Sequence, residues 1–288
     1  MKKTLSMLLA LSMACALSGC AGGSSTATTA AETTAAEAET TAEAAEDTTE
    51  AAEDAEDAAE DTEAAEESGD EAGVLSYEEY MAAELDTEVT IQAYVQAKQS
   101  WWEDKATVYA QDPDGGYFIY NMACSEEDYD RLTPGTKIQV TGYKAEWSGE
   151  VEIMDGTFEF VEDADTYVAD ATDVTDLLGT DGLQDYQNQF VTFVGMTVEA
   201  AGQDENGNDV AFLYNWDGSG TEGDDLYFNA SYKGETYTFT IESYLCDSTT
   251  EVYSAVKNLE IGQTIDMEGF LYWYEGVNPH ITSVTVIE

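Results

Sequence analysis

Three tryptophans are the first residues of this sequence whose chemistry suggests ligand binding. Trp101 and Trp102 are adjacent, and Trp147 follows in the same half of the chain. Indole faces stack on sugar rings, nucleobases and cations. We therefore take Trp101, Trp102 and Trp147 as candidate ligand-binding residues, provided that the fold brings them together.

The sequence contains few residues whose pattern suggests catalysis. His280 is the single histidine, and a lone histidine after Asn278-Pro279 is more often structural than catalytic. The sequence has no Ser/His nucleophile pair, no Gly-rich phosphate loop and no zinc-ligand spacing. A pair of acidic residues could serve as acid and base, but that chemistry needs a cleft. We expect a non-catalytic protein with no cofactor and no metal.

One acidic loop resembles a calcium site in its spacing. Oxygen-bearing side chains alternate in Asp204-Glu-Asn206-Gly-Asn208-Asp209, but the twelfth position, Asn215, is not the bidentate glutamate of an EF-hand. Asn206-Gly207 alone predicts a hairpin turn. We favour the hairpin here, and calcium stays the weaker alternative for this loop and for Asp217 to Asp225.

The N-terminus carries the pattern of an export signal. Met1-Lys2-Lys3 precedes an apolar run from Thr4 to Leu17, which is too short to span a membrane. The run ends in Leu17-Ser18-Gly19-Cys20, which resembles the bacterial lipobox. That resemblance implies a signal peptide at residues 1–19, lipidation of Cys20 and an extracytoplasmic protein anchored to the cell membrane by lipid. An ordinary secretory signal is the alternative.

A strongly acidic segment follows. The chain has a formal net charge of −52, and no Lys or Arg occurs between Thr4 and Ala97. Residues 20–75 consist mostly of Ala, Thr, Glu and Asp and have too few large apolar side chains to form a core. We expect a disordered tether there. From the net charge we also exclude nucleic acid as a partner, because phosphate binding requires basic surface.

Short strands predominate in the rest of the chain. In its first half, Ser76-x-x-Glu79 predicts a helix start, and Ser125 a second one. Alternating apolar residues and turn signals predict five strands, at residues 89–96, 106–111, 117–121, 137–143 and 149–160.

A repeated motif indicates a second copy of this unit. Leu-x-x-Gly-x-x-Ile-x-apolar-x-Gly-aromatic occurs twice with the same spacing, at Leu132, Gly135, Ile138, Val140, Gly142 and Tyr143, and at Leu259, Gly262, Ile265, Met267, Gly269 and Phe270. In the second copy we expect strands at 191–196, 211–215, 237–241 and 281–287, with strand four in the repeated motif itself. We also expect an extra segment at Trp216 to Glu235 that carries another short strand at 226–232, and a helix from Ser248 to about Leu259.

The order strand, strand, strand, helix, strand, strand resembles the oligonucleotide/oligosaccharide-binding fold, or OB-fold. The resemblance implies an all-β chain with short helices: two tandem five-stranded OB-like Greek-key barrels, at residues 76–165 and 170–288. In such barrels ligands meet strands two and three and the loops beside them, which carry Trp101, Trp102 and Trp147. The alternative for Trp147 is packing, because it aligns with Tyr274. Trp273 and Tyr274 are weaker candidates.

The remaining cysteines of the folded part, Cys124 and Cys246, precede equivalent helices in separate barrels. We favour two buried thiols over a disulfide. Together, these features predict a membrane-anchored binding module whose ligand is a carbohydrate, a wall fragment or a peptide. The alternative is a structural or assembly partner of another surface protein, with no small ligand.

Overall fold

The computed structural model describes residues 73–287 of the 288-residue chain. The predicted signal peptide, Cys20 and the tether up to residue 72 lie outside the described residues. Within residues 73–287, no helix is long and apolar enough to cross a bilayer. Both barrels described below belong to one compact unit of the chain.

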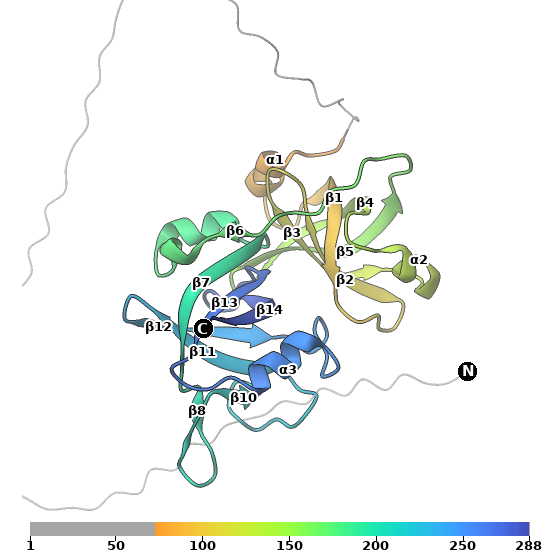
Figure 1. Cartoon of the computed structure of the whole chain (residues 1–288). Coiled ribbons are helices and arrows are strands. Elements are labelled where there is room, and N and C mark those ends of the chain that lie inside the picture. The colour runs from red at the N-terminus through yellow and green to blue at the C-terminus, as the bar shows by residue number, and fades with distance from the viewer. Residues whose placement is uncertain (1–72, 288) are drawn as a thin grey trace, which may run out of the picture. The chain divides into compact units, whose positions relative to one another are not determined.

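The first barrel is a closed sheet in the order β1-β2-β3-β5-β4 (Figure 1). All its pairings are antiparallel except β3 with β5. Alternate residues of β1 point into the barrel, which explains the apolar alternation of the sequence. The strands are β1 (Glu88–Lys98), β2 (Lys105–Gln111), β3 (Gly116–Ala123), β4 (Lys137–Trp147) and β5 (Glu150–Phe160).

Two capped helices belong to this half, as predicted. α1 (Tyr77–Ala82) begins with a capping box between Ser76 and Glu79. α2 (Glu126–Arg131) lies between β3 and β4, and the Ser125 side chain accepts a hydrogen bond from the Asp128 N–H. These caps satisfy backbone donors at the start of each short helix.

The second barrel repeats the same strand order. β7 pairs with β11 and β13, β11 pairs with β12, β14 pairs with β13, and β12 meets β14 in parallel, which closes a five-stranded ring. The all-β prediction of two OB-like barrels with short helices is therefore confirmed. The ring strands are β7 (Phe190–Glu199), β11 (Leu226–Tyr232), β12 (Glu235–Ile241), β13 (Thr264–Phe270) and β14 (His280–Ile287).

Short elements connect and extend this ring. β6 pairs with β7, β8 with β9, and β10 with β11 at the edge of the sheet. They are β6 (Thr172–Asp173), the 3-10 helices η1 (Thr175–Leu177) and η2 (Asp181–Tyr186), β8 (Gly202–Gln203), β9 (Asp209–Val210), β10 (Phe212–Tyr214) and α3 (Glu251–Lys257).

Two predictions for the second barrel are wrong. The segment at residues 211–215 is not strand two: β10 pairs only with β11, and β11, predicted as an extra strand, occupies that place by pairing with both β7 and β12. Both runs are short and apolar, and long-range pairing decides between them. The last helix is capped by Thr250 rather than Ser248, because an Asp247 turn to Thr249 precedes it.

The repeated motif marks the passage from helix to strand four in each barrel. Gly135 and Gly262 have φ values of +88° and +90°, and each N–H donates to strand one, to Val95 O and Val198 O respectively, at 2.8 Å. A side chain is strained at such φ values. The motif's first glycine is therefore required by the turn.

The motif's second glycine is required by close packing. A Cβ atom at Gly142 would lie 2.7 Å from Ile153 Cγ2, and one at Gly269 only 2.2 Å from His280 O. Strand four thus approaches strand five where the pairing register shifts in both barrels.

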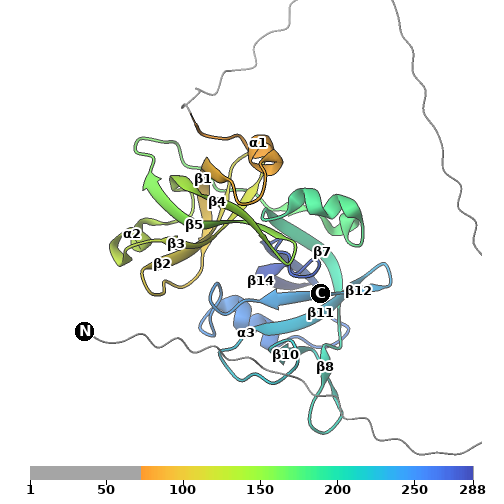
Figure 2. The ribbon, with the colours of Figure 1, turned by 180° about the vertical axis from the view of Figure 1, so that it is seen from behind.

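Each barrel has its own apolar core, and a third cluster joins them. Tyr109 and Phe118 of the first barrel pack against Phe270 and Tyr272 of the second. The Tyr109 hydroxyl and His280 Nδ1 are 2.9 Å apart and share a hydrogen bond. Figure 2 shows the two sheets from behind, with the connection through η1 and η2 leading into β7.

Cys124 and Cys246, the cysteines within the described residues, are free and buried, as favoured from the sequence. Burial raises the pKa of the Cys124 thiol to about 11 and that of the Cys246 thiol to about 12. Neither thiol is a reactive thiolate at neutral pH.

Candidate functional site

A large hollow lies where strands two and three of the two barrels face each other. Its volume is about 1250 Å³, above the roughly 300–1,000 Å³ of common small-molecule sites. We call it the inter-barrel hollow. The part of its lining that comes from strands two and three consists of Lys105, Thr107, Phe118, Tyr120 and Asn121 on β2 and β3, and of Tyr227, Asn229 and Thr238 on β11 and β12.

Exposed aromatic side chains gather around this hollow. Among residues 73–287, seven aromatic side chains are exposed, and six of them line it: Trp102, Tyr120, Trp147, Trp216, Tyr244 and Tyr274. Trp216 is 75% exposed and Trp102 67%. Such rings present free faces on which a flat or cationic group can stack.

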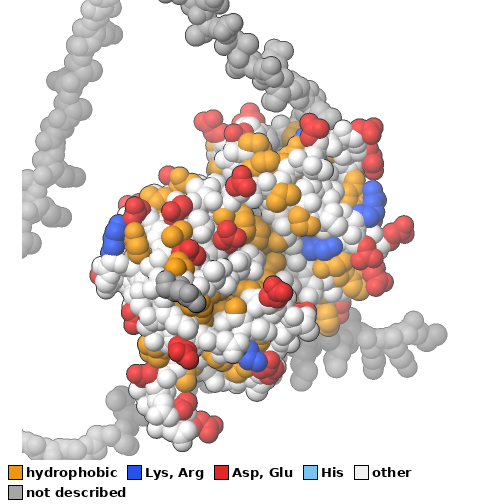
Figure 3. Space-filling view, viewed as in Figure 1, with side chains coloured by type: hydrophobic (Ala, Val, Ile, Leu, Met, Phe, Trp, Pro, Cys, Tyr) orange, Lys and Arg blue, Asp and Glu red, His pale blue; other side chains and the backbone are white. Residues whose placement is uncertain are grey.

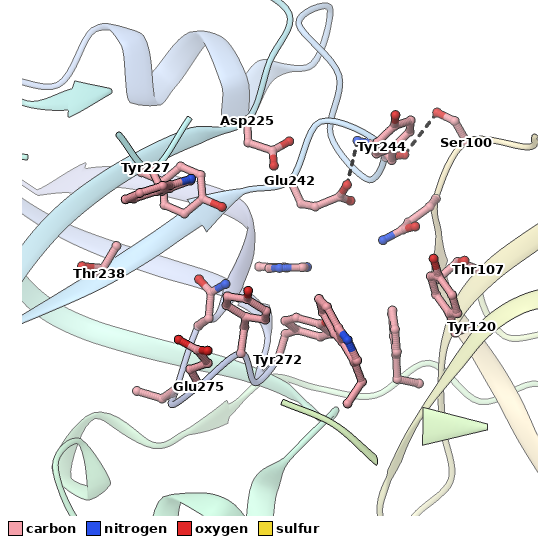
Figure 4. A pocket seen from close by; sticks show the side chains of 18 of the residues that line it. Ser100, Thr107, Tyr120, Asp225, Tyr227, Thr238, Glu242, Tyr244, Tyr272 and Glu275 are labelled. Atoms are coloured by element: carbon pink, nitrogen blue, oxygen red, sulfur yellow. Dashed lines mark hydrogen bonds between the residues drawn. The ribbon is translucent and has the colours of Figure 1, made fainter. Parts of the chain in front are cut away.

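Loops of the two barrels meet at the edge of the hollow. Ser100, after β1, donates to Tyr244 O from its N–H at 2.7 Å and from its hydroxyl at 3.1 Å, and Figure 4 shows the hydroxyl bond. On another side the Trp147 and Tyr274 rings lie 5.0 Å apart. The Glu275 N–H donates to Ser148 O at 2.7 Å. These contacts hold the walls together without filling the space between them.

Acidic side chains outnumber basic ones in the lining. Asp225, Glu242 and Glu275 line the hollow, and Lys105 is the one basic residue in its described lining. Burial, followed by the charge of Asp225, raises the pKa of Glu242 to about 7. Acidic side chains are also spread over the face drawn in Figure 3, where basic ones are few.

His280 also lines the hollow, at the start of β14. Its side chain is almost fully buried, and its ring stacks on Tyr272 with centroids 4.3 Å apart. Burial lowers the pKa of this imidazole to about 3, so the ring is neutral at neutral pH. The contact of its Nδ1 with Tyr109 fits the structural role expected from the sequence. The place of His280 in the lining of the hollow was not expected.

The structure brings together two of the three predicted tryptophans. Trp102, in the β1–β2 loop, and Trp147, at the end of β4, both line the hollow. Trp101 does not: it is partly buried, and its Nε1–H donates to Cys124 O at 3.0 Å. Ligand contact by Trp102 and Trp147 stays a prediction.

Most of the second barrel's contribution was missed. Trp216, Tyr227 and Glu242 were not among the candidates, although Trp216 opens the extra segment that distinguishes the second copy. These residues face the first barrel because the two barrels pack together through contacts such as that of Tyr109 with Phe270. No local sequence pattern predicts such a contact.

The acidic loop at Asp204 is a hairpin, as favoured. Asp204 Oδ1 accepts hydrogen bonds from the N–H groups of Asn206 and Asn208, both at 2.8 Å, between β8 and β9. In the part of the chain that the structure describes, no group of three His, Cys, Asp or Glu side chains could hold a metal ion.

No family model matches the chain, and neither does any curated protein. Several solved structures do match. One is the hypothetical protein ygiW from E. coli, at 19% identity and a TM-score of 0.23, over 31% of this chain and 89% of that one.

Two further matches are DNA complexes. A replication protein A heterotrimer bound to ssDNA matches at 13% identity and a TM-score of 0.29, over 70% of this chain and 49% of that one. A murine DNA binding protein bound with ds DNA matches at 11% identity and a TM-score of 0.32, over 69% and 98%. Identities and TM-scores this low assign no ligand to the chain.

These matches nevertheless correct one prediction. The predicted partners were a membrane, through the lipid on Cys20, and a glycan, peptide or surface-protein ligand, and nucleic acid was excluded. The exclusion of nucleic acid is wrong as an inference from net charge, and two of the matched proteins are themselves bound to DNA. The physical reason is that a net charge is a sum over the whole chain, to which the tether contributes 18 of the 61 acidic residues, and it does not show how charge is distributed over any one surface. Aromatic faces also stack bases without formal charge.

Proposed function

We propose that this protein is a non-catalytic binding module that holds its ligand in the inter-barrel hollow by stacking on aromatic side chains. One observation carries the proposal: six of the seven exposed aromatic side chains of residues 73–287 surround a single hollow. Packing does not account for rings that remain more than half exposed, as Trp102, Trp147 and Trp216 do. Clustered exposed apolar surface marks interaction sites.

The strand order supports the same location. OB-folds bind ligands on strands two and three and the adjoining loops. With β11 as strand two of the second barrel, that face of both barrels lines the same hollow. The sugar rings and peptide side chains favoured from the sequence stack on such walls, and nucleobases do as well.

We further propose that the module is displayed outside a bacterial membrane by lipid on Cys20. Leu17-Ser18-Gly19-Cys20 and the apolar run before it support this address. The acidic segment up to residue 75 would then separate the barrels from the lipid surface. Metabolic labelling with a fatty-acid analogue should mark the wild-type chain and not the Cys20→Ala variant.

Replacing an exposed tryptophan of the hollow should weaken ligand binding. We expect Trp216→Ala and Trp102→Ala each to reduce affinity about tenfold, because one stacking contact contributes roughly 1–3 kcal/mol. Calorimetric titration would use an oligosaccharide, a decathymidylate strand and a lysine-containing peptide as probes.

Tyr143→Ala is the matched control, because Tyr143 is the exposed aromatic residue that does not line the hollow. Its affinities should equal those of the wild type. If every probe that binds the wild type binds both tryptophan variants equally well, the hollow is not the site.

A further inference from the structure

Two carboxylates stand together on the wall that the second barrel contributes. Asp225 directly precedes β11 and Glu242 directly follows β12. Their neighbours in sequence, Leu226 and Ile241, are paired across the two strands. The register therefore places the two acids opposite each other (Figure 4). Like charges in that position destabilise a sheet. A compensating cation would remove this penalty.

The protein fixes these carboxylates without pairing either of them with a basic side chain. The Ser243 N–H donates to Asp225 Oδ1 at 2.8 Å, and the Leu245 N–H donates to Glu242 Oε2 at 2.9 Å. None of the ion pairs formed within residues 73–287 includes a residue that lines the hollow. Lys105, its one basic lining residue, lies on β2 of the opposite barrel.

A third polar group in the lining of the hollow is the His280 imidazole. The His280 side chain is 6% exposed, and its Nδ1 is paired with the Tyr109 hydroxyl. In the described part of the chain no residue bonds its Nε2. Nε2 is an acceptor when Nδ1–H donates to Tyr109, and it carries the proton when the Tyr109 hydroxyl donates to Nδ1. The imidazole can therefore offer a ligand either role in the hollow.

Aromatic rings stand beside these acceptors. Tyr227 lies near the start of β11, two residues after Asp225, and Tyr272 stacks on the His280 ring. Figure 4 shows Tyr227, Tyr272 and the two carboxylates around the same space. Aromatic faces together with carboxylates attract organic cations more strongly than either does alone.

We propose that the inter-barrel hollow binds its ligand through a protonated amine, with Asp225 and Glu242 as counter-ions and the neighbouring aromatic rings over its apolar part. The inference rests on the proposed function and specifies the ligand's chemistry. An amine supplies the positive charge that the carboxylate pair lacks and N–H donors for the acceptors of the wall.

The pH dependence follows from the groups that face Glu242. The raised pKa of Glu242, about 7, means that its carboxylate forms as the pH rises from 6 to 8. Amine affinity should rise over the same range. Besides Asp225, the titratable groups that face Glu242 are phenols and a thiol whose pKa values burial raises, and they stay neutral in this range: Tyr109, Tyr227, Tyr272 and Cys246.

The test compares charged and neutral probes of equal shape by calorimetric titration of the full chain. Benzylammonium is paired with benzyl alcohol, and the tripeptide Gly-Lys-Gly with Gly-norleucine-Gly. We expect the charged member of a pair to bind at least about tenfold more tightly, as cation–π and ion-pair contacts in a desolvated site add roughly 1–2 kcal/mol. Binding of benzylammonium indicates a small amine, and binding of Gly-Lys-Gly alone indicates a peptide amine.

Three variants locate the charge. Glu242→Gln and Asp225→Asn keep an oxygen for the backbone donors, and each should weaken the charged probe about tenfold while leaving the neutral probe unchanged. Glu159→Gln is the control: this exposed carboxylate on β5 does not line the hollow, and water and salt screen it. Its effect should stay below about threefold. Thermal melts verify that each variant folds. The pH series is measured on the wild type alone, so it does not depend on any variant folding.

Equal affinity for the charged and neutral probes overturns the inference, and so does an unchanged affinity of both carboxylate variants for the charged probe. Absence of binding by both amines overturns it as well. If an oligosaccharide or an oligonucleotide then binds and loses affinity in Trp216→Ala, the proposed function stands without the amine. If no probe depends on the tryptophans, the proposed function fails too.

Discussion

Replacing Tyr109 by alanine is expected to lower the free energy of unfolding by about 3–5 kcal/mol, the range typical of truncating a large buried aromatic side chain. Tyr109 is fully buried between the barrels. Its ring stacks on Phe270 at 4.3 Å and packs against Phe118 at 4.9 Å between centroids. Its hydroxyl is also the hydrogen-bond partner of His280, which the truncation leaves unpaired.

Urea unfolding followed by circular dichroism would measure this loss. Tyr109→Phe separates the two contributions, because it keeps the ring and removes the hydroxyl. We expect a smaller loss there, of about 1–2 kcal/mol. Tyr143→Ala, at an exposed position, should change stability by less than about 0.5 kcal/mol. A loss in Tyr109→Ala no larger than that in Tyr143→Ala would contradict the role of Tyr109 in joining the barrels.

Replacing Glu150 by glutamine is expected to stabilise the protein at alkaline pH. Glu150 lies at the start of β5 and is fully buried. Its Oε2 accepts hydrogen bonds from the Trp273 N–H at 2.8 Å and from Gln187 Nε2 at 3.2 Å, so it links the first barrel to the second and to the connection between them. Its Oε1 is buried without a hydrogen-bond partner in the described structure.

The direction of the effect follows from the pKa. Burial raises the pKa of Glu150 to about 8 from an ordinary value of 4.5. Between these values the folded state holds a proton that the unfolded state has released, so the free energy of unfolding falls as the pH rises, and it levels off above about 8. Burial raises the pKa of the neighbouring Glu152 to about 7, which acts in the same direction.

Glutamine is neutral at every pH and keeps an oxygen acceptor for Trp273 and Gln187. The variant should therefore match the wild type within about 1 kcal/mol at pH 5 and exceed its stability at pH 9, by an amount on the order of 3 kcal/mol. Urea unfolding at pH 5, 7 and 9 measures this. Glu159→Gln, at an exposed position of β5, is the control and should keep the wild-type pH slope. Identical slopes in the wild type and Glu150→Gln would refute the argument.

Local patterns predicted most of each barrel. The Ser76 and Ser125 caps, the alternation of β1 and the repeated glycines each encode a constraint that acts within a few residues or between neighbouring strands. Gly135 and Gly262, for example, are both needed at a left-handed turn and both donate to strand one. Such constraints can be recognised without a structure.

The predictions failed where distant segments compete or meet. Residues 211–215 and 226–232 are both short apolar runs, and only pairing with β7 makes the second of them strand two. This error hid the fact that the corresponding faces of both barrels line one hollow. It also hid the site residues of the second barrel, because Asp225 and Glu242 become neighbours only through the pairing of β11 with β12.

The tryptophans show the same limit. Trp101 and Trp102 are adjacent in sequence, yet Trp101 turns to a backbone carbonyl of its own barrel while Trp102 faces the hollow. Trp147 and Tyr274, aligned in the repeat, contact each other across the barrels. Their alignment therefore reflects neither packing within a single hairpin nor a role in ligand binding only.

The most direct test of the hollow as the ligand site uses the five indole N–H signals of the chain's five tryptophans. A proton–nitrogen correlation spectrum would be recorded during titration with benzylammonium, and with whichever other probe binds in calorimetry. Trp102, Trp147 and Trp216 line the hollow, whereas Trp101 and Trp273 do not. We predict that the first three signals shift with a common affinity and that the other two stay in place. Shifts confined to Trp101 and Trp273, or a bound probe that moves none of the three hollow signals, would contradict the account.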